Sequence, residues 1–314
     1  MGFFSSLFFS EKTEEDQQQK EDGKKFDILK YDGVRAQRIG KLEYAVKCFT
    51  EALKIREDFE TMKYLMSAFF TLNRNDEALE TLNAMVKTGE EPANVLLLRA
   101  NLLFMMSKPS EATADCMKAI ELEPDNCHAC FQLAKMQRVL GEPEKAIETI
   151  GSAIRIRDDF AEAYAFRADT FLSMENGNDA LADVEKLIEL TPEDETAYLL
   201  RGRIREFQGD ADAAFIDYQT ASELNPFNEE AYMLAGQLML NQKKYGEAIA
   251  LFDEAIENNE KFAKAYLARA FAKHQTGDHE GAVADEEKAR ELLPDEKLDP
   301  SEHNFDDLYK GNII

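Results

Sequence analysis

Apolar and polar positions follow the periodicity of amphipathic helices along most of the chain, and the pattern itself repeats. Alanine occurs at seven positions that are each 34 residues from the last, and Ala45 extends the series one step back with a spacing of 33. The seven are Ala78, Ala112, Ala146, Ala180, Ala214, Ala248 and Ala282. Further small residues, and Gly or Pro at the ends, recur around these alanines, so the sequence predicts two antiparallel helices in each unit.

The small residues predict where the two helices of a unit cross. Helices approach closely only where their side chains are small, so Ala or Gly at the crossing sets the distance between them. Aromatic residues at one shared position of successive units then fill the space between crossings, namely Tyr164, Tyr198, Tyr232 and Tyr266. The pattern predicts an all-α chain in which similar helix pairs stack on one another.

The period and the residue pattern resemble the tetratricopeptide repeat, a helix–turn–helix unit of 34 residues. One stretch carries the match closely, because Ala-Tyr-Leu-Leu-Arg-Gly from position 197 is followed by Gly209, Ala214, Tyr218, Ala221 and Pro226. The resemblance implies an α-solenoid, a right-handed superhelix of about eight repeats. We expect the repeats at residues 26–58, 59–92, 93–126, 127–160, 161–194, 195–228, 229–262 and 263–296.

Two segments lie outside this frame. Residues 1–25 are expected to form an apolar flap followed by a charged linker. Residues 297–314 are expected to cap the open end of the last repeat, with Ser301 beginning a short helix that carries Phe305. A partner-binding tail is the alternative for this second segment.

Charge and cysteine content restrict the class of protein. The chain has 62 acidic and 37 basic residues, a net charge of −25, which argues against binding to nucleic acid through bulk electrostatics. A hydrophobic content of 44% is enough for a packed core. Four cysteines are too few for a disulfide framework, and no apolar run reaches membrane-spanning length. These features predict a cytoplasmic protein that does not enter a membrane.

Arginine and aspartate occur together in four of the repeats. Each of these four has Arg at its seventh position and Asp at its twenty-third, whereas the other four have neither. The pairs are Arg99/Asp115, Arg167/Asp183, Arg201/Asp217 and Arg269/Asp285. We therefore predict an ion pair between the two helices of each of these repeats, rather than a row of ligand-binding arginines.

The stretch Cys127-His128-Ala129-Cys130, with Cys116 in the preceding predicted helix, is the candidate for redox or metal chemistry. No second Cys pair or His pair completes four metal ligands, and the remaining histidines, His274, His279 and His303, are scattered. Cysteine also packs well as a small apolar residue. We expect no catalytic residue, cofactor or metal, and therefore no enzyme.

In proteins of the tetratricopeptide repeat family, the first helix of each repeat lines a concave peptide-binding groove. The resemblance implies the same here, with a protein or peptide partner in the groove. From the apolar and charged residues at the groove positions we predict that an acidic or carboxylate end of this partner lies over Lys135 and Arg138. The expected groove residues are Lys30, Arg38, Lys63, Phe104, Phe131, Lys135, Arg138, Leu199 and Arg203. The alternative for the apolar members is packing between neighbouring helices.

The leading interpretation is a non-enzymatic scaffold or adaptor for protein partners. One alternative is a redox-responsive or metal-responsive protein that uses Cys116, Cys127 and Cys130. Another is a membrane-peripheral assembly factor that uses residues 1–9. The family's clamp for chaperone tails is incomplete in any three successive repeats, so a cochaperone role is not expected. The partner's identity and the oligomeric state stay open.

Overall fold

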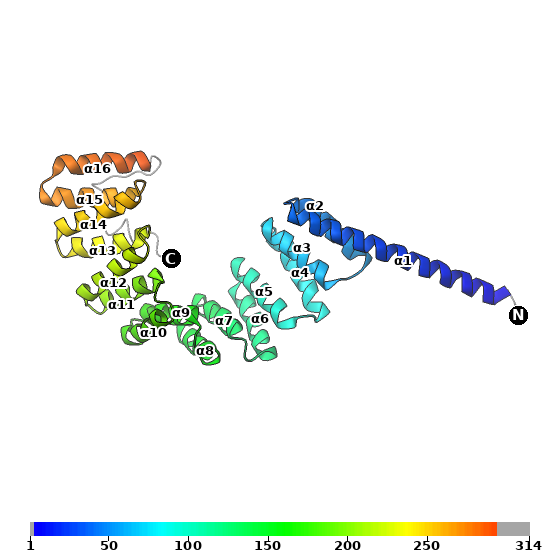
Figure 1. Ribbon diagram of the computed structural model, residues 1–314. Helices are drawn as coiled ribbons and strands as arrows, with labels where there is room; N and C mark the ends of the chain where they lie inside the picture. Colours follow the sequence, from blue (N-terminus) through cyan, green and yellow to red (C-terminus); the bar gives the residue numbers. More distant parts are fainter. Residues whose placement is uncertain (1–2, 294–314) are drawn as a thin grey trace. The chain divides into compact units, whose positions relative to one another are not determined.

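The computed structural model describes the backbone of residues 3–293 and the side chains from residue 16 onward. The described residues form sixteen α-helices, which follow one another as helix pairs (Figure 1). The helices are α1 (Phe3–Arg38), α2 (Leu42–Ile55), α3 (Phe59–Thr71), α4 (Asn75–Thr88), α5 (Pro92–Met105), α6 (Pro109–Leu122), α7 (Cys127–Val139), α8 (Pro143–Ile156), α9 (Ala161–Ser173), α10 (Gly177–Leu190), α11 (Glu195–Phe207), α12 (Ala211–Leu224), α13 (Glu229–Asn241), α14 (Tyr245–Asn258), α15 (Ala263–Thr276) and α16 (His279–Leu292). The predicted all-α solenoid of about eight helix pairs is confirmed.

The helices divide into two compact units. Unit 1 contains α1 to α8 and ends at Asp158, and unit 2 begins at Asp159 and contains α9 to α16. Within each unit, every helix packs against the next one along the chain. Each unit is therefore a stack of four helix pairs whose core lies between successive helices.

Small residues stand where the helices of a pair cross, as the sequence predicts. All eight alanines of the periodic series are 0% exposed. Gly202 shows how little room there is, because a Cβ atom placed on it would lie 2.3 Å from the Tyr218 ring. Gly236 faces Phe252 at the same distance. The large ring on the second helix of the pair thus fits only because the facing residue on the first helix is a glycine, which has no side chain.

The turn inside each helix pair contains one residue with a left-handed backbone. Glycine occupies it in four pairs, at positions 40, 141, 209 and 277, where a positive φ carries no steric cost. The other four turns use non-glycine residues with φ between 56° and 60°: Asn73, Ser107, Glu175 and Lys243. The same backbone geometry thus ends the first helix of every pair, whichever residue the sequence supplies.

The four predicted Arg–Asp ion pairs all form. In the pair on α9 and α10, the Arg167 Nε and Nη2 atoms each donate to one oxygen of Asp183 at 2.7 Å. Arg99 and Arg269 bind their aspartates in the same two-bond manner. The bridges tie the first helix of a repeat to the second, and all four aspartates are buried. Their role is structural.

The segment before the first repeat differs from the expectation. Residues 11–25, expected as a charged linker, are part of a continuous helix, because α1 runs without a break from Phe3 to Arg38. Gln, Glu and Lys dominate this stretch and are good helix formers, and a single Gly23 costs only about 1 kcal/mol. Figure 1 shows α1 projecting past its partner α2. The side chains of the expected flap, residues 1–9, and the expected capping segment, residues 297–314, lie outside the described residues.

Candidate functional site

The predicted basic groove residues of unit 1 begin on α1 and α3. Lys30, on α1, donates to the Asp58 Oδ2 atom at 3.0 Å and also to Glu60, at the start of α3. Lys63, on α3, donates to the Glu91 Oε1 atom, next to the start of α5, at 3.2 Å. Each lysine therefore connects the first helix of its own helix pair to the start of the first helix of the following pair, and its charge is compensated within the protein.

Unit 2 repeats this arrangement once. Arg203, on α11, forms an ion pair with Glu230, on α13. Three of the nine predicted site residues, Lys30, Lys63 and Arg203, are thus engaged between consecutive repeats. Their charge contributes to the stacking of repeats, and less of it is available to an acidic ligand than the sequence pattern indicates.

The ion pairs of Lys30 shift the pKa of the lysine and of its carboxylate partner Asp58. Burial opposes the charged form of Lys30, but its hydrogen bonds to Glu60 and Asp58 outweigh this and raise its pKa. Burial likewise opposes the charged form of Asp58, but hydrogen bonds from Thr61 and Lys30 lower its pKa below the ordinary value of 3.8. The link between α1 and α3 is therefore complete at neutral pH and is lost as the pH falls through the folded-state pKa of Asp58.

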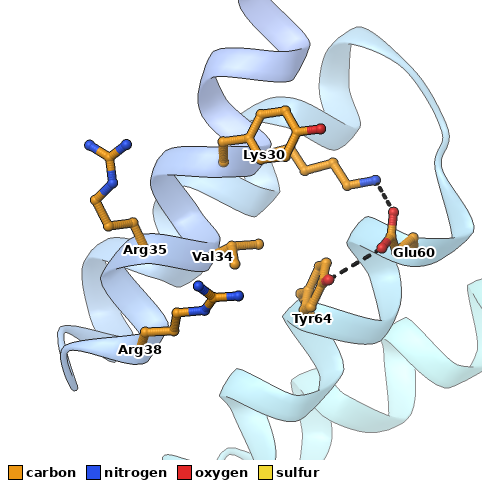
Figure 2. A pocket seen from close by; sticks show the side chains of 7 residues that line it. Lys30, Val34, Arg35, Arg38, Glu60 and Tyr64 are labelled. Carbon is orange, nitrogen blue, oxygen red and sulfur yellow. Dashed lines mark hydrogen bonds and ion pairs between the residues drawn. The ribbon is translucent and has the colours of Figure 1, made fainter.

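An open cleft of about 410 Å³ lies between α1 and α3. Its lining consists of Lys30, Tyr31, Val34, Arg35, Arg38, Glu60 and Tyr64. Figure 2 shows Lys30 and Tyr64 both directed to Glu60, whereas Arg38 extends along the cleft toward Tyr64 and Arg35 stands at the rim, directed away. Both arginines are exposed, and neither forms an ion pair within the described part of the chain. The cleft therefore combines apolar surface with uncompensated positive charge.

Phe131 and Lys135 lie together on α7, where the Lys135 ammonium is 5.7 Å from the centre of the Phe131 ring. Lys135 is exposed, and Phe131 and Arg138 are half-buried. Phe104, on α5, is also half-buried and packs against the core of its own unit. These residues, like Lys30, Arg38 and Lys63, belong to unit 1.

Leu199 departs from the predicted role. It is 4% exposed and lies in the core of unit 2 with Tyr218 and Ala231. A leucine at this position of the first helix points into the contact with the next repeat, so hardly any of its surface is available to a ligand. For Leu199 the packing alternative is correct.

The cysteines give no support to redox chemistry. All four are free thiols and all four are buried. Burial raises the pKa of Cys116 to about 12 and also raises the pKa of Cys130. Reactive cysteines need the opposite, a lowered pKa and access to solvent. In the described residues, no group of three or more His, Cys, Asp and Glu side chains is placed to hold a metal ion.

The structure brings together two histidines that the sequence analysis treats as scattered. His274, in the last turn of α15, and His279, the first residue of α16, face each other across the turn at Gly277. The signal in the sequence is two histidines five residues apart on either side of a turn glycine, which becomes visible only once the helix ends are placed. His303 lies outside the described residues.

Stacked helix pairs, with an open cleft between the first helices of the first two pairs, define a helical-repeat protein of the class that binds other proteins. None of the described helices combines the length and apolar character that crossing a membrane requires. A sequence model of the tetratricopeptide repeat matches residues 167–229, 208–262 and 233–297. Residues 167–297 are therefore tetratricopeptide repeats, and the helix pairs of the described residues have the fold of a tetratricopeptide repeat solenoid.

Individual relatives are distant. RNA polymerase II-associated protein 3 of Rattus norvegicus is 26% identical over 130 residues, which are 40% of this chain and 19% of that protein. The chain thus spans about a fifth of the length of this curated relative. Among solved structures, the C-terminal part of a tetratricopeptide repeat protein from Cytophaga hutchinsonii has a TM-score of 0.62 at 18% identity, covering 76% of this chain and 97% of that one. A tetratricopeptide repeat protein from Parabacteroides merdae has a TM-score of 0.57 at 20% identity, with 74% and 93% covered. Both share the fold.

Proposed function

We propose that the chain is a non-enzymatic scaffold, and that the cleft between α1 and α3 binds an acidic peptide segment of a protein partner. The observation that carries the proposal is the pair Arg35 and Arg38, which bring two uncompensated positive charges to a protein whose net charge is −25. Tyr31, Val34 and Tyr64 supply apolar surface beside them. Apolar burial gives such a site affinity, and the charges select the ligand and its register.

A second contact for the same ligand lies on α7, where Phe131 stands beside the exposed Lys135. This is the place expected from the sequence for an acidic or carboxylate end, with Arg138 one turn further along the helix. A cytoplasmic location belongs to the proposal, and four free, buried cysteines support it because reducing compartments keep thiols reduced.

Peptide display against the full chain, followed by calorimetry of the selected peptides, tests the proposal. We expect selected peptides to combine Asp or Glu with an aromatic or aliphatic anchor. Reversing both cleft charges, Arg35→Glu with Arg38→Glu, should weaken their binding at least tenfold, a loss of about 1.4 kcal/mol. The matched control is Arg290→Glu, which reverses an exposed arginine on α16 in unit 2 and should leave affinity unchanged.

Two results would reject this assignment. One is a selection dominated by neutral or basic peptides, and the other is an affinity that the double charge reversal leaves intact. The triple variant Phe131→Ala, Lys135→Glu, Arg138→Glu locates the acidic end separately. If it binds like the wild type while the α1 variant does not, the ligand occupies the cleft without reaching α7.

A further inference from the structure

The end of unit 2 holds a cluster of three side chains that the peptide-binding proposal does not use. The Nδ1 atoms of His274 and His279 are 3.2 Å apart. On the opposite edge of the first ring, the His274 Nε2 atom is 3.1 Å from the Glu286 Oε1 atom, on α16. His279 is exposed and the His274 side chain is 38% exposed, so the space between the two rings is open to solvent.

Glu286 determines which nitrogen of a neutral His274 carries the proton. A carboxylate only accepts hydrogen bonds, so the Nε2 atom facing it must be the donor. The Nδ1 atom of the neutral ring then carries a lone pair, and this lone pair lies on the side of His279. Orientation of a metal-binding histidine by a carboxylate on its other nitrogen is a recurring feature of metal sites.

The separation of the two Nδ1 atoms suits a shared metal ion. Zinc lies about 2.0–2.1 Å from histidine nitrogen and prefers tetrahedral angles. Two such bonds that span 3.2 Å enclose an angle of about 103° at the metal, close to the tetrahedral value. Without metal, the His274 Nδ1 lone pair accepts a hydrogen bond from the His279 Nδ1 atom, so His279 binds the ion in its other tautomer, with its ring proton on Nε2. Each lone pair then meets the ion about 40° off the line between the nitrogens, a rotation that exposed imidazole rings can make.

We propose that His274 and His279 bind one divalent transition-metal ion of the kind that prefers imidazole, such as Zn²⁺ or Ni²⁺, with Glu286 as the residue that positions His274. Two nitrogens fill two of the four positions, and water completes the others. Lys273, which precedes His274 in the sequence, does not bring an uncompensated charge, because its ammonium is paired with Asp285 at 2.8 Å. A bound ion ties the end of α15 to the start of α16.

Isothermal titration of the tag-free full chain with zinc chloride and nickel chloride tests the site, with magnesium chloride as the ion that should not bind nitrogen ligands. We expect one transition-metal ion per chain. His279→Ala and His274→Ala should each weaken binding at least tenfold. Glu286→Gln should weaken it by roughly 10- to 100-fold, the usual cost of losing such a carboxylate. His128→Ala, which removes a histidine of unit 1, is the matched control and should bind as the wild type does.

Nitrogen NMR of the imidazole rings adds a readout that does not depend on affinity. Zinc should move the Nδ1 resonances of both histidines and leave Nε2 of His274 protonated. Far-UV circular dichroism verifies that the variants are folded. The proposal is overturned if the wild type binds no zinc at about 1 mM, a concentration that half-fills even a site with a Kd of about 1 mM. It is equally overturned if the His274→Ala, His279→Ala double variant, which keeps all four cysteines, binds zinc as tightly as the wild type.

Discussion

Two of the Arg–Asp bridges should lose different amounts of stability when their arginine is replaced by leucine. In one, the Asp183 side chain is 8% exposed and forms an ion pair with Arg167 at 2.7 Å. In the other, Asp217 is 0% exposed, but it binds both Arg201 and, at 2.8 Å, Arg205. Replacing the bridging arginine with leucine therefore leaves Asp183 without its cation and leaves Asp217 with one.

The magnitudes follow from this difference. Arg167→Leu should destabilise unit 2 by about 3–5 kcal/mol, because a buried carboxylate loses its cationic partner. Arg201→Leu should cost about 1.5–3 kcal/mol, the range for losing a hydrogen bond to a charged group, because Arg205 still compensates the Asp217 carboxylate. Each arginine also stacks on a tyrosine of its own helix, at 5.8 and 5.4 Å from the ring centre, so this loss cancels in the comparison. The difference, about 2 kcal/mol, corresponds to about 30-fold in the local opening equilibrium.

Native-state hydrogen exchange measures that equilibrium separately in α9–α10 and in α11–α12, which suits a repeat protein better than a single unfolding transition. Adding Arg205→Leu to Arg201→Leu should bring the cost up to the level of Arg167→Leu. Equal losses for the two single variants, or a larger loss for Arg201→Leu, would refute the reasoning that a second arginine sustains Asp217.

Three further predictions concern packing, thiol reactivity and the turns. Gly202→Ala should lower the free energy of unfolding, measured by chemical denaturation, by about 1–3 kcal/mol because its Cβ meets the Tyr218 ring. Gly246→Ala is the control and should not destabilise the protein, because no atom lies within 4 Å of the added Cβ. Equal effects of the two substitutions would contradict the packing argument. Cys116, with a pKa raised to about 12, should be alkylated at pH 8 only after unfolding in urea, and peptide mass spectrometry showing rapid native labelling would count against this. Lys243→Gly should stabilise by about 0.5–1 kcal/mol, since glycine adopts φ 59° without strain; an unchanged or lower denaturation midpoint would show that the turn is unstrained.

The features predicted correctly from the sequence are those that recur at a fixed separation. The periodic alanines are buried because each repeat places them at the same helix crossing. The Arg–Asp bridges could be predicted because partners such as Arg167 and Asp183 are always 16 residues apart and occur together or not at all. Repetition supplies several independent examples of one contact inside a single chain.

What the sequence does not determine is how individual side chains are used at those positions. Lys30 and Arg203 lie on the first helices of their repeats, as predicted. Each of them, however, binds an acidic residue of the next repeat, 27 to 30 positions away. Comparing each basic residue with the start of the following repeat would have indicated these pairs. Leu199 is buried because the neighbouring repeat covers it. Its position in the repeat predicts contact with a ligand, but position alone does not show whether the next repeat covers the side chain.

The extended first helix has a mechanical consequence. The part of α1 that precedes the first repeat, residues 3–25, rises about 1.5 Å per residue and so spans about 35 Å as a helix, less than half of what the same chain covers when fully extended. A flexible linker of this length would let an attached group search a wide volume. A helix that continues directly into the first repeat acts instead as a spacer. It holds its far end at a set distance and direction from the cleft between α1 and α3.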